Sequence, residues 1–184
     1  MIQFPLKVDD DIELRLFTQD DAHLLHSLIT TNRNHLDQWL RWSARVQTLE
    51  NTHDFIQRML DRYHAKEGFH VGLWYRGQLA GGIACRDMNY DSLHAEIGYW
   101  LGEEFVGKGL VAKSCRAIIT LLFEQEQMHR IEIQCATDNL KSRAVAERLG
   151  FTFEGVKRES EWITDSFRDH ALYSLLSHEW QAIR

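Results

Sequence analysis

The sequence predicts one α/β domain, of the α+β kind, in which helices flank a central sheet. Its 184 residues match the size of a single ordinary domain. Hydrophobic residues make up 44% of the chain and charged residues 26%, enough for an apolar core beneath a charged surface. The expected order of elements is strand, helices, three strands, helix, strand, helix and two strands. This order differs from the regular alternation of a doubly wound fold. We expect one domain over residues 1–184, with its core at about residues 10–178.

The first third of the chain predicts a strand followed by helices. Residues 12–17 alternate between apolar and polar, which indicates a strand with one buried face. Thr18 and Asp21 form a capping-box-like start for a helix. A third helix is expected from about Thr52 to near Gly68. Apolar residues at helical spacing support three helical regions: Leu24, Leu25, Leu28 and Ile29; then Leu36, Trp39 and Leu40; then Phe55, Ile56, Met59, Leu60 and Tyr63.

Strands dominate the rest of the chain. They are expected at residues 69–75 and 78–85, around a turn at Arg76-Gly77, and at residues 94–101. A long helix begins near Leu110, and a strand at residues 130–136 leads to a helix at 139–149, for which Gly150 is the C-cap. Two strands at about residues 154–163 and 168–176 close the chain. The long helix has one apolar stripe: Val111, Cys115, Ile118, Ile119 and Leu122.

Charge and composition exclude several functions. The formal net charge of −6 disfavours direct nucleic-acid binding, which depends on cations that neutralise phosphates. The chain has no run of about 18 apolar residues, so no membrane span is expected. Residues 1–11 are acidic where a signal peptide would be basic, so we expect a cytoplasmic protein. Cys85, Cys115 and Cys135 are far apart and indicate buried free thiols, and no histidine or cysteine spacing indicates a metal site.

The most informative segment is a loop between a strand and a helix at residues 96–113. Gly107 and Gly109 let the backbone approach an anion, and the first turn of the helix presents unpaired N–H groups. This geometry suits a pyrophosphate. Three interpretations compete: an ordinary turn, a nucleotide-binding P-loop, and the cofactor site of a family that the segment resembles. The P-loop interpretation is the weakest, because Gly109 stands where a P-loop needs Ser or Thr for magnesium.

The loop resembles motif A of the GNAT acyltransferase superfamily, Q/R-x-x-G-x-G/A. Gly107 and Gly109 match this pattern, whereas Glu104 departs from its first position. The wider string E-I-G-Y-W-L at residues 96–101 is similar to the RimJ/RimL branch, which contains ribosomal-protein N-terminal acetyltransferases. The segment from Asn139 to Ser142 and the later Leu-Gly-Phe at 149–151 resemble the second family motif. The resemblance extends over nearly the whole chain.

This resemblance implies the GNAT fold, with a mixed and mostly antiparallel central sheet, and acetyl-CoA as cosubstrate. The pantetheine arm would pair with the strand at Tyr99, Trp100 and Leu101, and the pyrophosphate would lie on the loop and helix start. Besides the three strand residues, the resemblance implies eight cofactor-binding residues in the loop, at the helix start and in the second motif: Val106, Gly107, Lys108, Gly109, Leu110, Val111, Asn139 and Ser142.

The resemblance also implies candidate catalytic residues. An α-amine has a pKa of roughly 8 and must lose a proton before it attacks. Glu96 stands where related enzymes often place a base, although the alternation around it also fits an ordinary polar strand face. A backbone N–H near Tyr99 or Trp100 would stabilise the oxyanion. Many relatives have a tyrosine four positions before the Gly-Phe glycine, where this chain has Ala146, so Ser142 is the substitute as hydrogen-bond donor to the leaving thiolate.

The sequence defines the acceptor of the acetyl group less clearly than it defines the cofactor. The RimJ/RimL resemblance favours a protein N-terminal α-amine, with a ribosomal protein as the first candidate. A small amine such as a polyamine, amino acid or antibiotic stays open, and so do a non-catalytic acyl-CoA-binding module and a homo-oligomer. Aromatic residues that fit either an acceptor cleft or a core are Trp39, Trp42, Phe69, His70 and Trp74.

Overall fold

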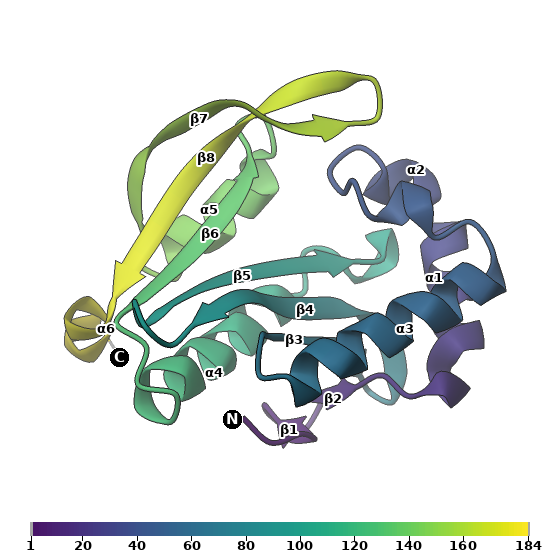
Figure 1. Ribbon diagram of the computed structural model, residues 1–184, viewed down its shortest axis with the longest axis horizontal. Coiled ribbons are helices and arrows are strands. Elements are labelled where there is room, and N and C mark those ends of the chain that lie inside the picture. Colours follow the sequence, from purple (N-terminus) through teal and green to yellow (C-terminus); the bar gives the residue numbers. More distant parts are fainter. Residues whose placement is uncertain (1, 184) are drawn as a thin grey trace.

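The computed structural model describes residues 2–183 and contains one eight-stranded sheet (Figure 1). The strand order is β1-β2-β3-β4-β5-β6-β8-β7. All neighbours pair antiparallel except β5 and β6, which are parallel, so the predicted mostly antiparallel sheet is confirmed. The strands are β1 (Leu6–Lys7), β2 (Ile12–Leu16), β3 (Phe69–Tyr75), β4 (Gln78–Asn89), β5 (His94–Leu101), β6 (Arg130–Ala136), β7 (Thr152–Ile163) and β8 (Ser166–Leu176).

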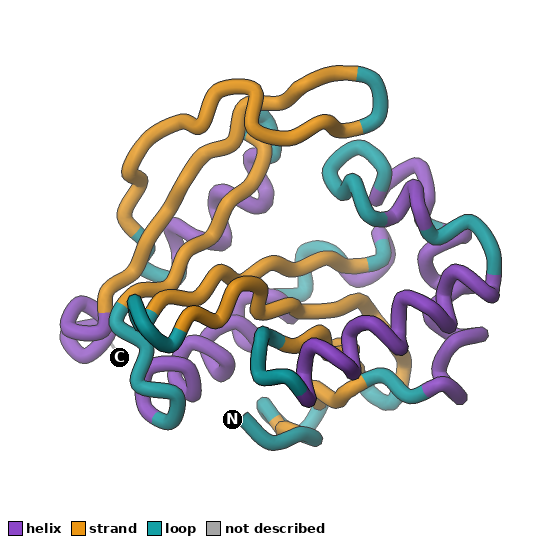
Figure 2. The backbone as a smooth tube through the Cα atoms, viewed as in Figure 1, coloured by secondary structure: helices purple, strands orange, loops and turns teal. Residues whose placement is uncertain are grey.

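Helices cover both faces of the sheet, which Figure 2 shows as purple segments around the orange strands. On one face, α1 (Ala22–Thr31) and α3 (Leu49–His64) pack together and against β3 and β4. On the other face lie α4 (Leu110–Glu124), α5 (Leu140–Arg148) and α6 (Ser177–Ile183). The remaining elements are the one-turn α2 (Arg33–Leu36) and the 3-10 helices η1 (Gln19–Asp21), η2 (Ser43–Arg45) and η3 (Glu103–Phe105).

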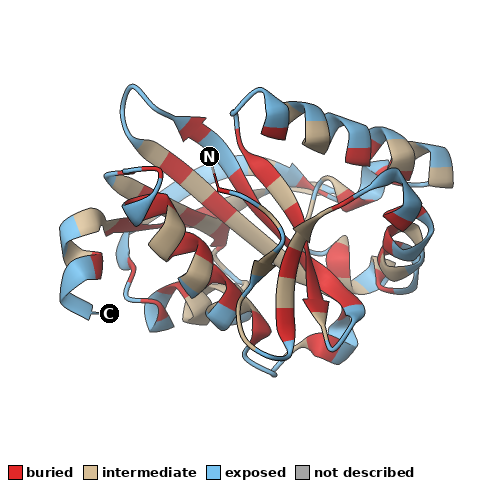
Figure 3. Cartoon of the chain, turned by 90° about the horizontal axis from the view of Figure 1, so that it is seen from below, coloured by how far each residue is buried: buried red, intermediate tan, exposed pale blue. Residues whose placement is uncertain are grey.

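Two hydrophobic cores follow from this layering, one on each side of the sheet. Strand residues alternate between the faces, so Val71 and Leu73 lie in the core with α4, whereas Trp74 packs with α1 and α3. The stripe predicted on α4 is confirmed, with Cys115, Ile118, Ile119 and Leu122 fully buried. Figure 3 shows the helices buried on their sheet-facing side and exposed on the other. No helix among residues 2–183 is long and apolar enough to cross a membrane.

The pairing between β5 and β6 ends early, and this creates the main opening of the molecule. Only three residue pairs join the two strands, and the last is Glu96 with Glu132. Beyond this point β5 continues along β4 as far as Leu101, whereas β6 continues along β8 as far as Ala136. The two strands therefore diverge (Figure 1). On the β6 side of residues 97–101, no strand within residues 2–183 pairs with the main chain.

Several predicted elements differ from the structure. The third helix starts at Leu49 because Thr48 and Asn51 form a capping box, and it ends at His64 rather than near Gly68. In the first helix, Leu24 is 54% exposed and lies outside the buried stripe. Strand β1, helix α6 and the extension of β4 to Asn89 were not predicted.

The second predicted helix is the largest error. Helix α2 ends at Leu36, and Trp39 and Leu40 lie in the loop that follows. The Arg33 guanidinium donates hydrogen bonds to the main-chain carbonyls of Ser43 and Val46, which holds this loop in an irregular path. The apolar residues in this region therefore belong to a loop that packs onto the sheet, and not to a helix.

Candidate functional site

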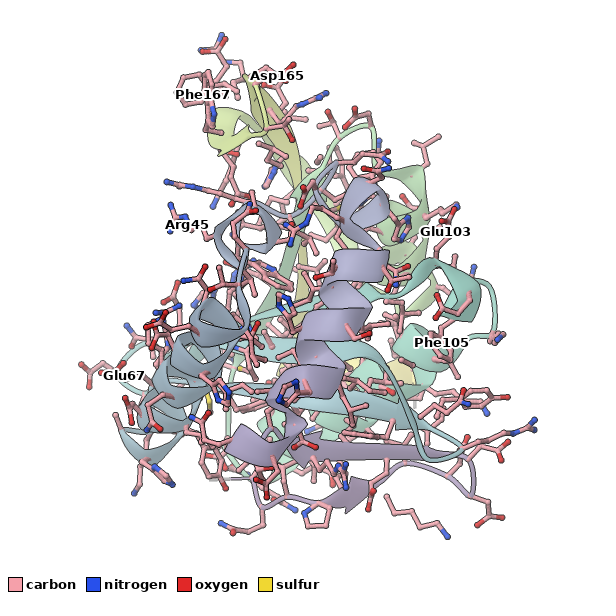
Figure 4. All side chains as sticks on the ribbon, turned by 90° about the vertical axis from the view of Figure 1, so that its right-hand side faces the viewer. Arg45, Glu67, Glu103, Phe105, Asp165 and Phe167 are labelled. Carbon is pink, nitrogen blue, oxygen red and sulfur yellow. The ribbon has the colours of Figure 1, made fainter. Side chains whose placement is uncertain are left out.

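A cleft of about 550 Å³ opens where β5 and β6 diverge. One side is lined by the start of α4 and by α5, and the other by the loop after α2 and by the β7–β8 hairpin. The hairpin tip contacts the loop after α2, because Thr164 Oγ1 donates a hydrogen bond to the Asp37 carbonyl at 2.9 Å. Figure 4 shows this tip, marked by Asp165 and Phe167, above the loop that carries Arg45.

Strand alternation separates the cleft into two chemical environments. Arg86, Glu96 and Gln134 lie on the sheet face that also carries α1 and α3. Tyr99 and Cys135 lie on the opposite face, toward α4 and α5. A ligand that enters from the α4 and α5 side therefore meets a second ligand from the other face at the gap between the strands.

The glycine loop has the open backbone that an anion site needs. Gly107 and Gly109 have φ angles of 85° and 73°, which favour glycine, and a Cβ at either position would have no neighbour within 4 Å. Gly109 caps α4, whose first N–H groups have no partner within the helix. The loop is anchored by Asn32, whose Oδ1 accepts a hydrogen bond from the Glu103 N–H at 2.8 Å. Sequence reasoning missed Asn32, since no motif connects it to the loop.

Most predicted cofactor residues line the cleft, but Lys108 does not. The Lys108 ammonium lies over the rings of Phe105 and Tyr75, at 5.1 and 5.8 Å from their centroids. The predicted residues that do line the cleft are Tyr99, Trp100, Leu101, Val106, Gly107, Gly109, Leu110, Val111, Asn139 and Ser142.

Two cations that sequence reasoning missed lie on the cofactor side. Lys141 and Arg148 are on α5, line the cleft and are exposed. Neither side chain forms a hydrogen bond or ion pair with the residues that the structure describes. Together with the N-terminus of α4, they match the phosphates of a coenzyme A molecule. The residues present therefore fit acetyl-CoA.

Ser142 is held in place by two neighbours. The Asn139 side chain caps α5 and accepts a hydrogen bond from the Ser142 N–H at 3.1 Å. The Ser142 hydroxyl donates to the Tyr99 hydroxyl at 3.1 Å, and the Tyr99 hydroxyl donates to the Ser142 carbonyl at 3.0 Å. Burial raises the pKa of Tyr99, so its hydroxyl stays protonated. Cys135 lines the cleft beside Ser142, and burial raises the pKa of its thiol.

Glu96 lies on the sheet face that carries α1 and α3, beneath the surface of the cleft. Its carboxylate accepts a hydrogen bond from Arg86 Nη2 and another from Gln134 Nε2 at 3.2 Å. Arg86 and Gln134 line the cleft, whereas Glu96 is covered by them. Burial raises the pKa of Glu96, and the Arg86 guanidinium offsets part of that shift. A raised pKa makes the carboxylate a stronger base, which suits a group that takes up a proton.

A second acid–base pair lines the cleft. His170 Nε2 on β8 lies 3.5 Å from Glu161 Oε2 on β7. Burial lowers the pKa of His170, and Glu161 opposes that shift, so the imidazole is neutral near pH 7. Sequence reasoning missed both residues, because they lie nine positions apart on two strands and form no recognisable motif.

Aromatic side chains line the cleft on the sheet face that carries α1 and α3. Trp42 packs edge-on against Trp100, with ring centroids 5.5 Å apart, and stacks on Phe55 at 5.3 Å. His70 contacts Phe55 and lines the cleft, and burial lowers its pKa to about 3. Trp39 also lines the cleft. Phe69 and Trp74, the other aromatic candidates, are buried in the two cores.

Nothing in this part of the molecule resembles a metal centre. Within residues 2–183, no three histidine, cysteine, aspartate or glutamate side chains are grouped as metal ligands. The three cysteines are free and buried, as predicted.

Comparison with known proteins gives a consistent result. Residues 11–152 match the acetyltransferase (GNAT) domain family. The chain is 37% identical to "Putative ribosomal N-acetyltransferase YdaF" of Bacillus subtilis, over 97% of this chain and 98% of that protein. It is 30% identical to the ribosomal-protein-serine acetyltransferase of Escherichia coli, over 92% and 94% of the two chains. The solved structure of the ribosomal L7/L12 alpha-N-protein acetyltransferase RimL in complex with coenzyme A matches with a TM-score of 0.91 and 28% identity, over 94% of this chain and 98% of that one.

Proposed function

The chain belongs to the GNAT acetyltransferase family and uses acetyl-CoA, and we propose that its acceptor is the α-amine at a protein N-terminus, with a ribosomal protein as the first candidate. The observation that carries this proposal is the similarity to ribosomal-protein acetyltransferases along nearly the whole chain, including both sides of the cleft. The lining of the cleft supports it, because the loop after α2 and the β7–β8 hairpin, which meet at Asp37 and Thr164, enclose together with the sheet a space that a peptide N-terminus can enter.

Acetyl-CoA supplies a thioester carbonyl that an amine attacks directly. In the proposed complex, the N–H groups at the start of α4 bind the pyrophosphate, and the main chain at Tyr99 to Leu101 pairs with the pantetheine arm. A main-chain N–H of β5 near Tyr99 stabilises the negative charge on the carbonyl oxygen. Lys141 and Arg148 add positive charge for the phosphates.

The amine must lose a proton, and two groups are candidates to accept it. Glu96 is the candidate from the sequence, and its raised pKa suits the role, but Arg86 and Gln134 separate it from the cleft. A water held by these side chains would carry the proton to Glu96 Oε2. The alternative is the Glu161–His170 pair, which lines the cleft directly. Substitution of each carboxylate by glutamine distinguishes the two candidates.

The departing thiolate needs a proton donor. Ser142 Oγ is positioned for this role by Tyr99 and by the Asn139 cap. Because a serine hydroxyl is a weak acid, we propose that it acts as a hydrogen-bond donor in a relay with the Tyr99 hydroxyl. Ala146, at the position of the missing family tyrosine, lies on the fully buried side of α5 and leaves the donor role to these two hydroxyls.

The test has two stages. Calorimetric titration with acetyl-CoA is expected to show binding, whereas ATP with magnesium is expected to show none. The purified protein is then incubated with acetyl-CoA and a panel of peptides, polyamines and amino acids, and released thiol is measured. Acetylation of peptide α-amines, located by mass spectrometry, supports the proposal. Transfer to small amines alone contradicts the acceptor assignment, and binding without any transfer favours a non-catalytic acyl-CoA module.

A further inference from the structure

The charge of the cleft is opposite to the charge of the chain. The protein has 27 acidic and 21 basic side chains, excluding histidine, and a formal net charge of −6. The cleft, however, is lined by four arginine or lysine residues and one carboxylate. The cations are Arg41, Arg86, Lys141 and Arg148, and the carboxylate is Glu161. This excess of cations indicates that the cleft binds more than one anionic group.

The phosphates of acetyl-CoA account for only half of these cations. Lys141 and Arg148 lie on α5, beside the cofactor loop. Arg86 projects from β4 on the opposite face of the sheet, as its register with Glu96 and its contact with Gly98 show. Arg41 lies in the loop after α2, next to Trp42, which packs against Trp100 on that same face. Arg41 and Arg86 therefore face the acceptor rather than the phosphates.

The geometry of Arg86 suits an anionic ligand. Glu96 lies below it and orients the guanidinium, yet 45% of the Arg86 side chain stays exposed. A guanidinium has five N–H donors, so donors remain for a second carboxylate. Arg41 is exposed and makes no hydrogen bond or ion pair with residues 2–183, so its charge is not neutralised by the protein. Glu161 provides the opposite charge beside His170, which lies on the same sheet face as Arg86, and an ammonium group can approach Glu161 before deprotonation.

We infer that the acceptor carries a negative charge close to its amine, and specifically that the preferred acceptor is a peptide N-terminus with Asp or Glu among its first few residues. Arg41 and Arg86 bind that carboxylate while the α-amine lies beside Glu161 and the end of β5. This inference rests on the proposed transfer to a protein N-terminus and adds the chemical class of that terminus.

Matched peptides test the inference. They share one N-terminal serine and differ only at the next three residues, which are acidic, amide or basic. We expect kcat/KM to fall by about tenfold to a hundredfold from the acidic to the amide peptide, as for loss of a charge-assisted hydrogen bond, and further for the basic peptide. The preference should weaken at high salt, because both arginines are partly exposed.

A charge reversal sharpens the test. Arg41→Glu is expected to reduce or invert the preference for the acidic peptide, whereas Arg45→Glu is expected to preserve it. Arg45 is the matched control because it is exposed on the same loop but does not line the cleft (Figure 4). Arg86→Lys keeps the charge without the planar fork and is expected to weaken the preference only in part.

The outcomes separate this inference from the proposed function. If all peptides are acetylated at equal rates, or if Arg41→Glu leaves the preference unchanged, the inference is wrong while the proposed function stands. If no peptide is acetylated, the proposed function fails. A third arm tests free aspartate and an aminoacyl phosphate, and exclusive transfer to either of these would overturn the choice of a peptide acceptor.

Discussion

Replacement of Glu96 by glutamine removes a carboxylate while preserving its shape. The wild-type carboxylate accepts hydrogen bonds from Arg86 and Gln134, and its side chain is 13% exposed, whereas that of Arg86 is 45% exposed. Loss of one partner from a fully buried ion pair costs about 3–5 kcal/mol. Because solvent screens the half-exposed arginine, we expect about 1 kcal/mol here, which corresponds to a fall in Tm of about 2–4 °C for a chain of this size.

The kinetic effect of Glu96→Gln should be larger than this structural cost. If Glu96 accepts the proton from the amine, turnover falls by about 10²–10⁴-fold, as for loss of a general base. The affinity for acetyl-CoA should change little, because Glu96 lies on the sheet face opposite α5. Turnover is measured by thiol release over the full range of pH, and cofactor affinity by calorimetry. Burial raises the pKa of Glu96, so the acid limb of the wild-type profile should lie above the pKa of an ordinary glutamate.

Glu132→Gln is the matched control. Glu132 pairs with Glu96 across the β5–β6 register and accepts a hydrogen bond from Gln134 at 3.3 Å, but it does not line the cleft. Its substitution should lower stability and leave turnover near the wild-type value. If Glu96→Gln keeps wild-type turnover at every pH, Glu96 has no part in proton transfer. A large loss in Glu161→Gln alone would assign the base to the Glu161–His170 pair.

Three further predictions concern the proposed cofactor side of the cleft, the buried cysteines and His70. Arg148→Ala should raise the Kd for acetyl-CoA about tenfold at low salt and less at high salt, whereas Lys113→Ala, outside the cleft, should have no effect; calorimetry at two salt concentrations measures both. Acetyl-CoA should protect Cys135 from alkylation, whereas Cys115, fully buried in the core, should not react in the folded protein; mass spectrometry compares the two thiols. The pKa of His70 is about 3 in the folded state, so the unfolded chain takes up a proton near pH 6.5 first, and the free energy of unfolding should fall as pH drops below 6.5. Urea titrations should show a smaller fall in the free energy of unfolding below pH 6.5 for His70→Asn than for the wild type. An equal fall in both proteins would refute the attribution of this pH dependence to His70.

The sequence is a good guide to elements whose cause is local. The strand at β3 and the cofactor loop were predicted because alternation and the two glycines act over a few residues. The loop after α2 was mistaken for a helix, because its path depends on hydrogen bonds from Arg33 to carbonyls ten and thirteen positions away. Periodicity contains no information on such side-chain contacts.

The acceptor side shows the same limit more clearly. Glu96 was predicted as a base or as an ordinary residue of a polar strand face, and its cover by Arg86 was not predicted, because this cover depends on the antiparallel register of β4 and β5. The Glu161–His170 pair forms across an irregular hairpin with a shift in register. Neither arrangement can be found without knowing which strands are neighbours. Family motifs predicted most of the residues on the proposed cofactor side of the cleft for the opposite reason, since these residues fall in two short segments of the chain.

The early separation of β5 from β6 has a consequence for how the sequence of such a protein can change in evolution. The cofactor side of the cleft comes from residues 97–148, whereas the acceptor side comes mainly from the loop after α2 and the β7–β8 hairpin. Substitutions or length changes in those two surface segments can therefore alter the acceptor without disturbing the use of acetyl-CoA. The same division makes the loop and the hairpin suitable for transfer into a related protein. The affinity of the resulting chimera for acetyl-CoA would then show whether the fold of the recipient is intact.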